Sequence, residues 1–234
     1  MDQGFYFSRM SQTKKTSKEI SVKLVATAVL FLVAIFLFAF IAKVVVLNRK
    51  DLFDSAAFHF FSTYTTPFTI EVMKVFTFLG STSFLLPAYL VLVLWLWSKR
   101  QKRLALDVGI IAISSELLKL GLKNVFQRQR PDLPLLQSLK TFSFPSGHAL
   151  SSFIFCSILI YVLWKEDIQR AWKWVFSIVL VLVAVMIGVS RVVLRYHYAS
   201  DVIAGFCMGF SWVTFTLWLM NKIHFYIQGR KGKI

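Results

Sequence analysis

The sequence contains several long apolar runs, and the run from Leu24 to Leu47 constrains the fold most strongly. Its single charged residue is Lys43, which is close enough to the end of the run for its side chain to reach the membrane surface. A helix that crosses a bilayer needs about 20 mainly apolar residues. The run is too long for the apolar part of a signal peptide, and no small-residue cleavage site follows it. We therefore expect a first transmembrane helix here.

Further apolar runs follow, so the sequence predicts an all-α, polytopic membrane protein with six transmembrane helices. The composition agrees, because 57% of the 234 residues are hydrophobic and only 16% are charged, which is too apolar for a soluble domain of this length. Pro87 is expected to kink the second helix. The spans are expected at about residues 22–47, 72–97, 104–125, 147–164, 174–193 and 201–220. Together they form a domain over 22–220, with basic tails at 1–21 and 221–234.

The basic residues predict the orientation in the membrane. Lys and Arg total 27 against 11 Asp and Glu, a formal net charge of +16. They gather in the two tails and in the loops 99–103 and 165–173, which alternate to one side of the membrane. Under the positive-inside rule that side is cytoplasmic, so both termini are inside and the segments 48–71, 126–146 and 194–200 are outside. Because the positive-inside rule accounts for the excess of basic residues, no nucleic-acid partner is expected. The pattern predicts a multi-pass protein of the cell membrane.

The outer segment 48–71 is rich in aromatic residues, which favour the headgroup region of a membrane. An interfacial helix is the first interpretation, and a lid or lipid entrance is the alternative. The aromatic residues are Phe53, Phe58, Phe60, Phe61, Tyr64 and Phe68.

Polar residues at the end of the third span form the first candidate site segment. Lys123 closes the span, and Arg130 follows seven residues later, immediately before Pro131. A proline disfavours helix at the preceding residue, so Arg130 is expected on extended chain. Basic residues are unexpected on the outer face, which points to anion binding by Lys123 and Arg130. Arg128 is interpreted as solvated or facing lipid headgroups.

The second candidate segment opens the fourth span with Pro145, Ser146, Gly147 and His148. Ser146 is a good N-cap, and Gly147 lets a ligand approach the backbone. Free N–H groups and the positive end of the helix dipole make such a helix start an anion site. His148 in the first turn is then expected to touch the anion.

The third candidate segment, Ser190–Asp201, lies between the last two spans. Arg191 ends the fifth span, and His197 and Asp201 are four residues apart, a spacing that lets their side chains meet. A carboxylate bonded to one imidazole nitrogen leaves a lone pair on the other. His197 is therefore a candidate nucleophile or base, oriented by Asp201.

Together the three segments fit phosphoryl transfer, which needs an in-line nucleophile and positive charge around the phosphoryl oxygens. Near this site on the outer face we expect only two carboxylates, Asp132 and Asp201, which are too few for a site that holds divalent metals. The sequence therefore predicts a site without metal or cofactor, with cationic side chains supplying the charge.

The order Lys-x6-Arg-Pro, Pro-Ser-Gly-His and Ser-Arg-x5-His-x3-Asp resembles the three signature motifs of the type-2 phosphatidic acid phosphatase superfamily, and every signature position is matched. The likeness extends to its phosphatidylglycerophosphatase B and undecaprenyl-diphosphatase type enzymes. The motifs cover about residues 123–201, and the six-helix layout extends the likeness over most of the chain.

The resemblance implies a mechanism and a class of substrate. His197 attacks phosphorus to form a phosphohistidine, Asp201 orients it, and His148 protonates the leaving oxygen. The residues that hold the phosphate are Lys123, Arg130, Ser146, Gly147 and Arg191. The implied substrate is a membrane lipid, namely phosphatidylglycerophosphate, phosphatidic acid or undecaprenyl diphosphate, with the active site on the extracytoplasmic face.

Two other functions remain open, a lipid phosphotransferase and an anion or lipid transporter. The paired His197 and Asp201 favour an enzyme, because a binding site alone does not need an oriented imidazole. Gly205 and Gly209 form a G-x-x-x-G motif in the last span. It predicts close helix packing, either within the bundle or between two chains of a homo-oligomer. 

Two further groups of residues are given no role in the reaction. Glu116 and Lys119 are expected to form a structural ion pair. His224, on the opposite face, is expected to take no part in catalysis.

Overall fold

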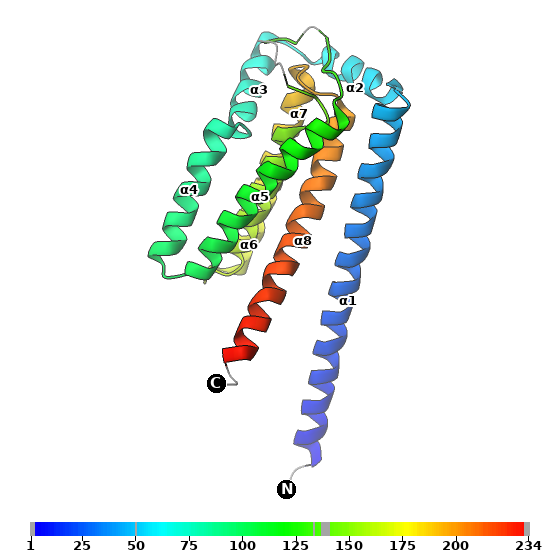
Figure 1. The fold of residues 1–234 in the computed structure, drawn as a ribbon. Coiled ribbons are helices and arrows are strands. Elements are labelled where there is room, and N and C mark those ends of the chain that lie inside the picture. The colour runs from blue at the N-terminus through cyan, green and yellow to red at the C-terminus, as the bar shows by residue number, and fades with distance from the viewer. Residues whose placement is uncertain (1–2, 50, 133, 137–140, 232–234) are drawn as a thin grey trace.

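A computed structural model describes residues 3–49, 51–132, 134–136 and 141–231, and the side chains of 3–21 and 229–231 lie outside the description. The described residues contain helices and no strand, so the all-α prediction is confirmed (Figure 1). The helices are α1 (Gln3–Ala42), the π-helical turn η1 (Lys43–Leu47), α2 (Leu52–Thr63), α3 (Pro67–Leu79), α4 (Thr82–Ser98), α5 (Lys102–Phe126), α6 (Gly147–Leu163), α7 (Arg170–Val193) and α8 (Ala199–Lys231).

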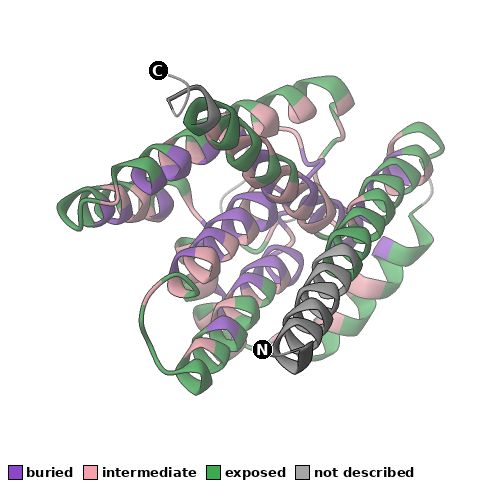
Figure 2. Ribbon diagram, turned by 90° about the horizontal axis from the view of Figure 1, so that it is seen from below, coloured by how far each residue is buried: buried purple, intermediate pink, exposed green. Residues whose placement is uncertain are grey.

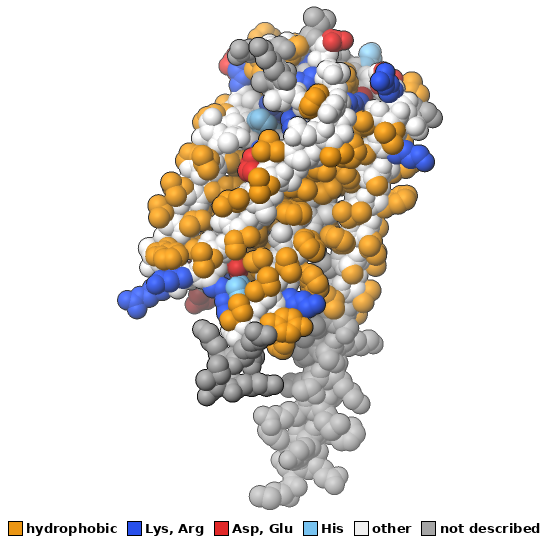
Figure 3. Space-filling model, in the orientation of Figure 1, with side chains coloured by type: hydrophobic (Ala, Val, Ile, Leu, Met, Phe, Trp, Pro, Cys, Tyr) orange, Lys and Arg blue, Asp and Glu red, His pale blue; other side chains and the backbone are white. Residues whose placement is uncertain are grey.

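The long helices lie side by side in one bundle, and the short helix α2 crosses one end of it (Figure 1). On the face that Figure 3 shows, hydrophobic side chains cover the middle of the described part of the molecule, while Lys and Arg side chains gather towards its two ends. Figure 2 shows that the exposed residues lie on the outward faces of the helices. A surface that is apolar around its middle suits a lipid environment.

Three described helical stretches are long and apolar enough to cross a membrane: Val22–Leu47, Arg170–Val193 and Ala199–Gln228. The pair α3 and α4 adds a fourth if it is counted as one bent span, and α6 is apolar but shorter. These helices support a membrane protein, whereas the count of six spans and the cytoplasmic side of the termini stay predictions. The basic character of the tail at 1–21 rests on side chains outside the description.

The predicted second span is broken six residues before Pro87, between α3 and α4. α3 and α4 meet at an angle of 45° at Gly80 and Ser81, whereas Pro87 lies inside α4. Ser81 caps α4 by accepting a hydrogen bond from the N–H of Phe84 at 3.3 Å. A Cβ on Gly80 would lie 2.4 Å from Cγ2 of Ile187, so the absence of a side chain lets the break pack against α7. The kink at Pro87 itself stays a prediction.

The centre of the bundle is α6, which packs against α7 and α8 and supplies many of the buried apolar residues. Gly205 and Gly209 of α8 face it closely. A Cβ on Gly205 would lie 2.8 Å from the carbonyl oxygen of Ser146, and one on Gly209 would lie 3.2 Å from the ring of Phe153. The G-x-x-x-G motif is therefore used within the bundle, and a homo-oligomer through it stays a prediction.

The outer segment 48–71 contains α2, which carries exposed Phe53 and Phe60 and, just after its end, exposed Tyr64. Asp54, in the first turn of α2, is by contrast only 1% exposed. The segment thus forms the short helix α2, with one buried carboxylate, and the first turn of α3 (Pro67–Leu79), while the interfacial position of α2 stays a prediction. Its role as a lid stays open.

Candidate active site

The three sequence segments meet at the end of the bundle that α2 crosses. Lys123 lies in the last turn of α5, His148 in the first turn of α6, and Arg191 in the last turn of α7. His197 lies between α7 and α8, and Asp201 in the first turn of α8. His197 and Arg191 are close enough to act electrostatically on His148. The fold therefore brings the predicted catalytic residues together.

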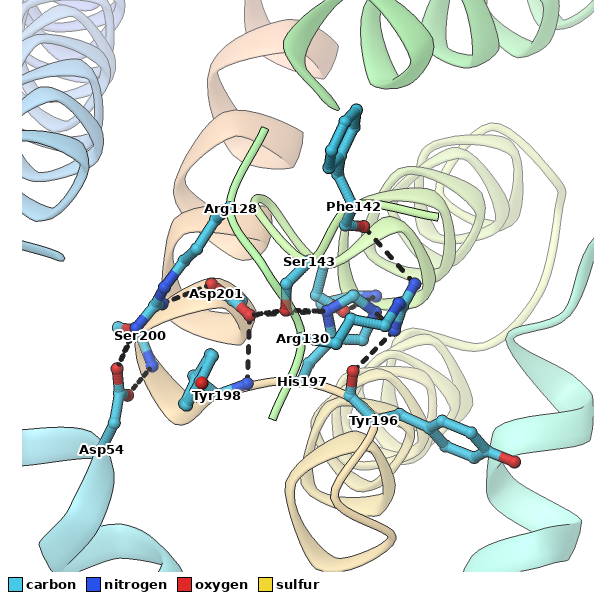
Figure 4. Close-up of polar contacts among 12 residues, drawn as sticks. Asp54, Arg128, Arg130, Phe142, Ser143, Tyr196, His197, Tyr198, Ser200 and Asp201 are labelled. Atoms are coloured by element: carbon cyan, nitrogen blue, oxygen red, sulfur yellow. Dashed lines mark hydrogen bonds and ion pairs between the residues drawn. The ribbon is translucent and has the colours of Figure 1, made fainter. Parts of the chain in front are cut away.

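His197 is 1% exposed, and its ring is held through Ser143 (Figure 4). Nδ1 of His197 lies 3.2 Å from Oγ of Ser143, and that hydroxyl donates to Oδ2 of Asp201. The direct separation from Nδ1 to Oδ2 is 3.5 Å, which is long for a hydrogen bond. Asp201 is thus connected to His197 mainly through Ser143, which the sequence interpretation did not include, and its orienting role stays a prediction.

The arrangement around the ring favours one tautomer. If Nδ1 carries the proton and donates it to Ser143, Nε2 keeps its lone pair. Nε2 lies 3.3 Å from Nη1 of Arg130, a group that is only a donor. Burial lowers the pKa of His197 well below its ordinary value, and the charges of Arg191, Arg130 and Lys123 add to this effect. The imidazole is therefore neutral, with a lone pair directed at a cationic site.

Arg130 is on non-helical chain, as Pro131 predicted, and is fixed by backbone carbonyls. Its Nε donates to the carbonyl of Thr141 and its Nη1 to that of Tyr196, both at 2.6 Å. Lys123 donates from Nζ to the carbonyl of Phe142 at 2.8 Å. Both cations are thus held beside His197 without a carboxylate partner of their own among the described residues.

Arg191 is 2% exposed and has unused donors. Its Nη1 donates to the hydroxyl of Thr77 on α3, and its guanidinium stacks on the ring of Tyr196 at 4.2 Å. Nε and Nη2 are buried and have no hydrogen-bond partner among the described residues. Buried donors are almost always paired, so two unpaired ones indicate a binding position for an acceptor such as a phosphate oxygen.

The start of α6 has the expected helix cap. Ser146 is the N-cap and accepts from the N–H of Ala149 at 3.4 Å. A Cβ on Gly147 would lie 2.9 Å from Cδ of Lys119, so glycine makes room for that lysine. The N–H of Ser146 donates to the carbonyl of Asp201 at 3.0 Å, which ties the start of α6 to α8. The phosphate-binding roles of Ser146 and Gly147 stay predictions.

Arg128 was misplaced by the sequence interpretation. Its side chain is 10% exposed and forms ion pairs with Asp201 at 2.6 Å and with Asp54 at 2.8 Å. Burial lowers the pKa of Arg128, but the charges of Asp201 and Asp54 outweigh this effect and raise it. Arg128 is therefore neither solvated nor headgroup-facing. The expectation that Asp132 and Asp201 were the only carboxylates near the site was also wrong, because Asp54 joins them.

The residues that were given no role lie as expected. Glu116 and Lys119 form an ion pair within α5. His224 of α8 bonds to Asp107 of α5 at 2.9 Å, far along both helices from the site.

Similar proteins were found by sequence and by structure. Phosphatidylglycerophosphatase B of Bacillus subtilis is 34% identical over 145 residues, which cover 61% of this chain and 71% of the relative. An undecaprenyl-diphosphatase of Sulfolobus acidocaldarius is 31% identical over 123 residues, covering 50% of this chain and 55% of the relative. The crystal structure of a transmembrane PAP2 type phosphatidylglycerolphosphate phosphatase from Bacillus subtilis superimposes with a TM-score of 0.76 at 27% identity, covering 82% of this chain and 96% of that one.

The family model of the PAP2 superfamily matches residues 104–225, a stretch that holds all three motifs and more than half of the chain. The chain belongs to the PAP2 superfamily.

Proposed function

We propose that this protein is an integral-membrane lipid phosphate phosphatase that hydrolyses a phosphate or diphosphate headgroup through a phosphohistidine. The observation that carries the proposal is the buried imidazole of His197, whose Nε2 lies 3.3 Å from Nη1 of Arg130. The two unpaired donors of Arg191 add a place for phosphate oxygens. A lone pair on nitrogen surrounded by cations suits attack on phosphorus.

The reaction has two steps in this proposal. Nε2 of His197 attacks phosphorus, the bond from phosphorus to the lipid oxygen breaks, and His148 gives that oxygen its proton. Neutral His148 then takes a proton from water, the water oxygen attacks phosphorus, and the phosphorus–nitrogen bond breaks to free His197 and inorganic phosphate. Lys123, Arg130 and Arg191 stabilise the charge on the phosphoryl oxygens in both steps.

A membrane lipid is the proposed substrate because the site lies at one end of a bundle whose middle is apolar (Figure 3). The names of the relatives favour phosphatidylglycerophosphate and undecaprenyl diphosphate, with phosphatidic acid as the third member of the class. We place the site on the extracytoplasmic face of the cell membrane, since the loops rich in Lys and Arg lie at the other end. A reporter fused after Ile234 is expected on the cytoplasmic side, and an extracellular reporter would overturn this orientation.

The test is release of inorganic phosphate from a panel of these three lipids by the purified protein in detergent. Wild type is expected to release phosphate from at least one lipid, and His197→Ala is expected to abolish release while still inserting and folding. Undiminished activity of His197→Ala would overturn the proposed nucleophile. Acid-labile label on the wild-type protein after brief exposure to ³²P-labelled substrate would report the phosphohistidine, and the same label on His197→Ala would refute His197 as its site.

The same panel separates the two alternatives. A phosphotransferase would move phosphate to an acceptor lipid and release little to water. A transporter would move the lipid or anion across vesicles without phosphate release. The oriented imidazole of His197 favours hydrolysis over transport.

A further inference from the structure

Arg128 connects two buried carboxylates from distant parts of the chain (Figure 4). Its Nη1 donates to Oδ1 of Asp201 at 2.6 Å, and its Nη2 donates to Oδ2 of Asp54 at 2.8 Å. Asp201 is 0% exposed and Asp54 is 1% exposed. A buried carboxylate is costly unless it is paired and hydrogen-bonded, so this shared guanidinium is required by both.

Ser200 closes the connection between α2 and the start of α8. Its N–H donates to Oδ1 of Asp54 at 2.8 Å, and its hydroxyl donates to Oδ2 at 2.6 Å. The same hydroxyl accepts from Nη1 of Arg128 at 2.8 Å. Asp54 therefore receives three donors and is held as firmly as the catalytic carboxylate itself.

Arg128 also holds Ser143, the residue that connects Asp201 to His197; we call Asp201, Ser143 and His197 the relay. The N–H of Ser143 donates to the carbonyl of Arg128 at 2.8 Å. Arg128 thus holds Asp201 with its side chain and Ser143 with its backbone, and these are the two residues that fix Nδ1 of His197. The Cζ atom of Arg128 lies over the ring of Tyr198, 3.9 Å from its centroid, and this contact limits movement of the guanidinium.

We propose that Asp54 and Arg128 are positioning residues for the hydrolytic reaction. Through Asp54, the position of helix α2 affects the orientation of the His197 ring. The inference rests on the proposed function. Neither residue touches the phosphate, because the Arg128 guanidinium is taken up by Asp54, Asp201 and Ser200. Both act through Asp201 and Ser143 on the nucleophile.

The decisive variant is Asp54→Asn, which keeps the shape of the side chain and removes its charge. We expect kcat to fall about 10- to 100-fold, because a small misplacement of a reacting group costs about this much. KM should change little, since Lys123, Arg130 and Arg191 are untouched. Asp51→Asn is the matched control. Asp51 immediately precedes α2, is exposed and makes no side-chain cap bond, so its kcat should stay within about two-fold.

Two more variants test the connection itself. Arg128→Lys keeps the charge but cannot reach two carboxylates with a planar fork, and it should lower kcat in the same way. In the double variant with Asp54→Asn the losses should not multiply, because both changes break one unit. Ser200→Ala removes only the bridging hydroxyl and should cost about five-fold in kcat. It decides the question if Asp54→Asn does not fold.

The pH profile separates positioning from a merely structural role. Arg128→Gln removes a cation near the relay, so it should raise the pKa of His197 and shift the acidic limb of kcat/KM to higher pH. Asp54→Asn removes an anion and should shift that limb to lower pH, each by up to about one unit. General loss of structure would not give opposite shifts. Among the described residues, the charged or titratable groups around His197 are Lys123 of α5, Arg130, His148 of α6, Arg191 of α7 and Asp201 of α8, with Arg128 and Asp54 beyond Asp201.

All measurements use the full chain in detergent at a temperature below the unfolding transition of every variant, with the panel lipid that turns over fastest. If wild type is active and folded Asp54→Asn keeps its kcat within two-fold, the positioning role is wrong and the phosphatase stands. Multiplying losses in the double variant, or limbs that move together, would also overturn it. If wild type releases phosphate from no lipid, the proposed function fails and the inference falls with it.

Discussion

Removal of the Ser143 hydroxyl is the most direct test of the relay at His197. In Ser143→Ala, Nδ1 of His197 loses its acceptor and Oδ2 of Asp201 loses a donor. The remaining separation of 3.5 Å between Nδ1 and Oδ2 is too long to replace them without movement. Asp201 would keep the N–H of Tyr198 on Oδ2 at 3.0 Å and Arg128 on Oδ1. The carboxylate should therefore stay in place while the imidazole becomes free to turn.

The magnitude follows from the cost of an unmatched buried polar group. That cost is about 1–3 kcal/mol. If this cost raises the free energy of the transition state and not that of the bound substrate, kcat falls by about 5- to 150-fold. The loss should be smaller than the roughly 10⁴-fold seen when the carboxylate of a serine-protease triad is replaced by an amide, because Asp201 itself is unchanged. KM should stay near the wild-type value, since the Ser143 hydroxyl bonds to His197 and Asp201 and has no hydrogen bond to Lys123, Arg130 or Arg191 among the described residues.

The assay is inorganic phosphate release over a range of lipid concentrations, so that kcat and KM are separated. Ser152→Ala is the matched control. Ser152 is also fully buried, but its hydroxyl donates to the carbonyl of Ala149 within its own helix at 3.3 Å, and we expect wild-type kinetics. A Ser143→Ala protein with kcat within two-fold of wild type would refute the relay. A loss that appeared only in KM would refute the assignment to the nucleophile.

Three other predictions concern packing, pH and metal. Gly205→Ala should lower stability by about 1–3 kcal/mol, since its Cβ would meet the Ser146 carbonyl at 2.8 Å, whereas Gly109→Ala, with nothing within 4 Å, should leave stability unchanged or raise it; equal melting temperatures would contradict this. The acidic limb of kcat/KM should lie below pH 6.5, because a lowered pKa keeps His197 neutral and nucleophilic to lower pH; a limb above 6.5 would show that burial does not control the nucleophile. A chelator such as EDTA should leave phosphate release intact and vanadate should inhibit it; loss of activity that added Mg²⁺ restores would show a metal-dependent enzyme.

The sequence predicted which motif residues would meet, because three polar segments at one level of a membrane bundle have few other places to lie. It separated Arg128 from Arg130, two residues later, but placed Arg128 in solvent or at lipid headgroups and not between Asp54 and Asp201. Gln127, which ends α5 just before these two residues, adopts a left-handed conformation with φ of 46°. The chain changes direction there, and the two guanidiniums then reach different partners. No local pattern in the sequence shows that turn.

Asp54 was missed for a different reason. It lies in an aromatic segment that resembles a plain interfacial helix, and its partners are more than 70 positions away in the chain. Only burial reveals it, and burial depends on the docking of α2. The break between α3 and α4 was likewise missed, because it depends on the close approach of Gly80 to Ile187, a contact that only the fold creates.

The two unpaired donors of Arg191 have a consequence for how flux through the enzyme is controlled. A protein that holds such donors is stabilised by any tetrahedral oxyanion that pairs with them, by an amount that grows with the logarithm of the anion concentration. Inorganic phosphate is such an anion, so the released product should compete with the lipid for the same position and raise the melting temperature of the free protein. Turnover would then slow as phosphate accumulates on the side of the membrane to which the site opens, without a separate regulatory site.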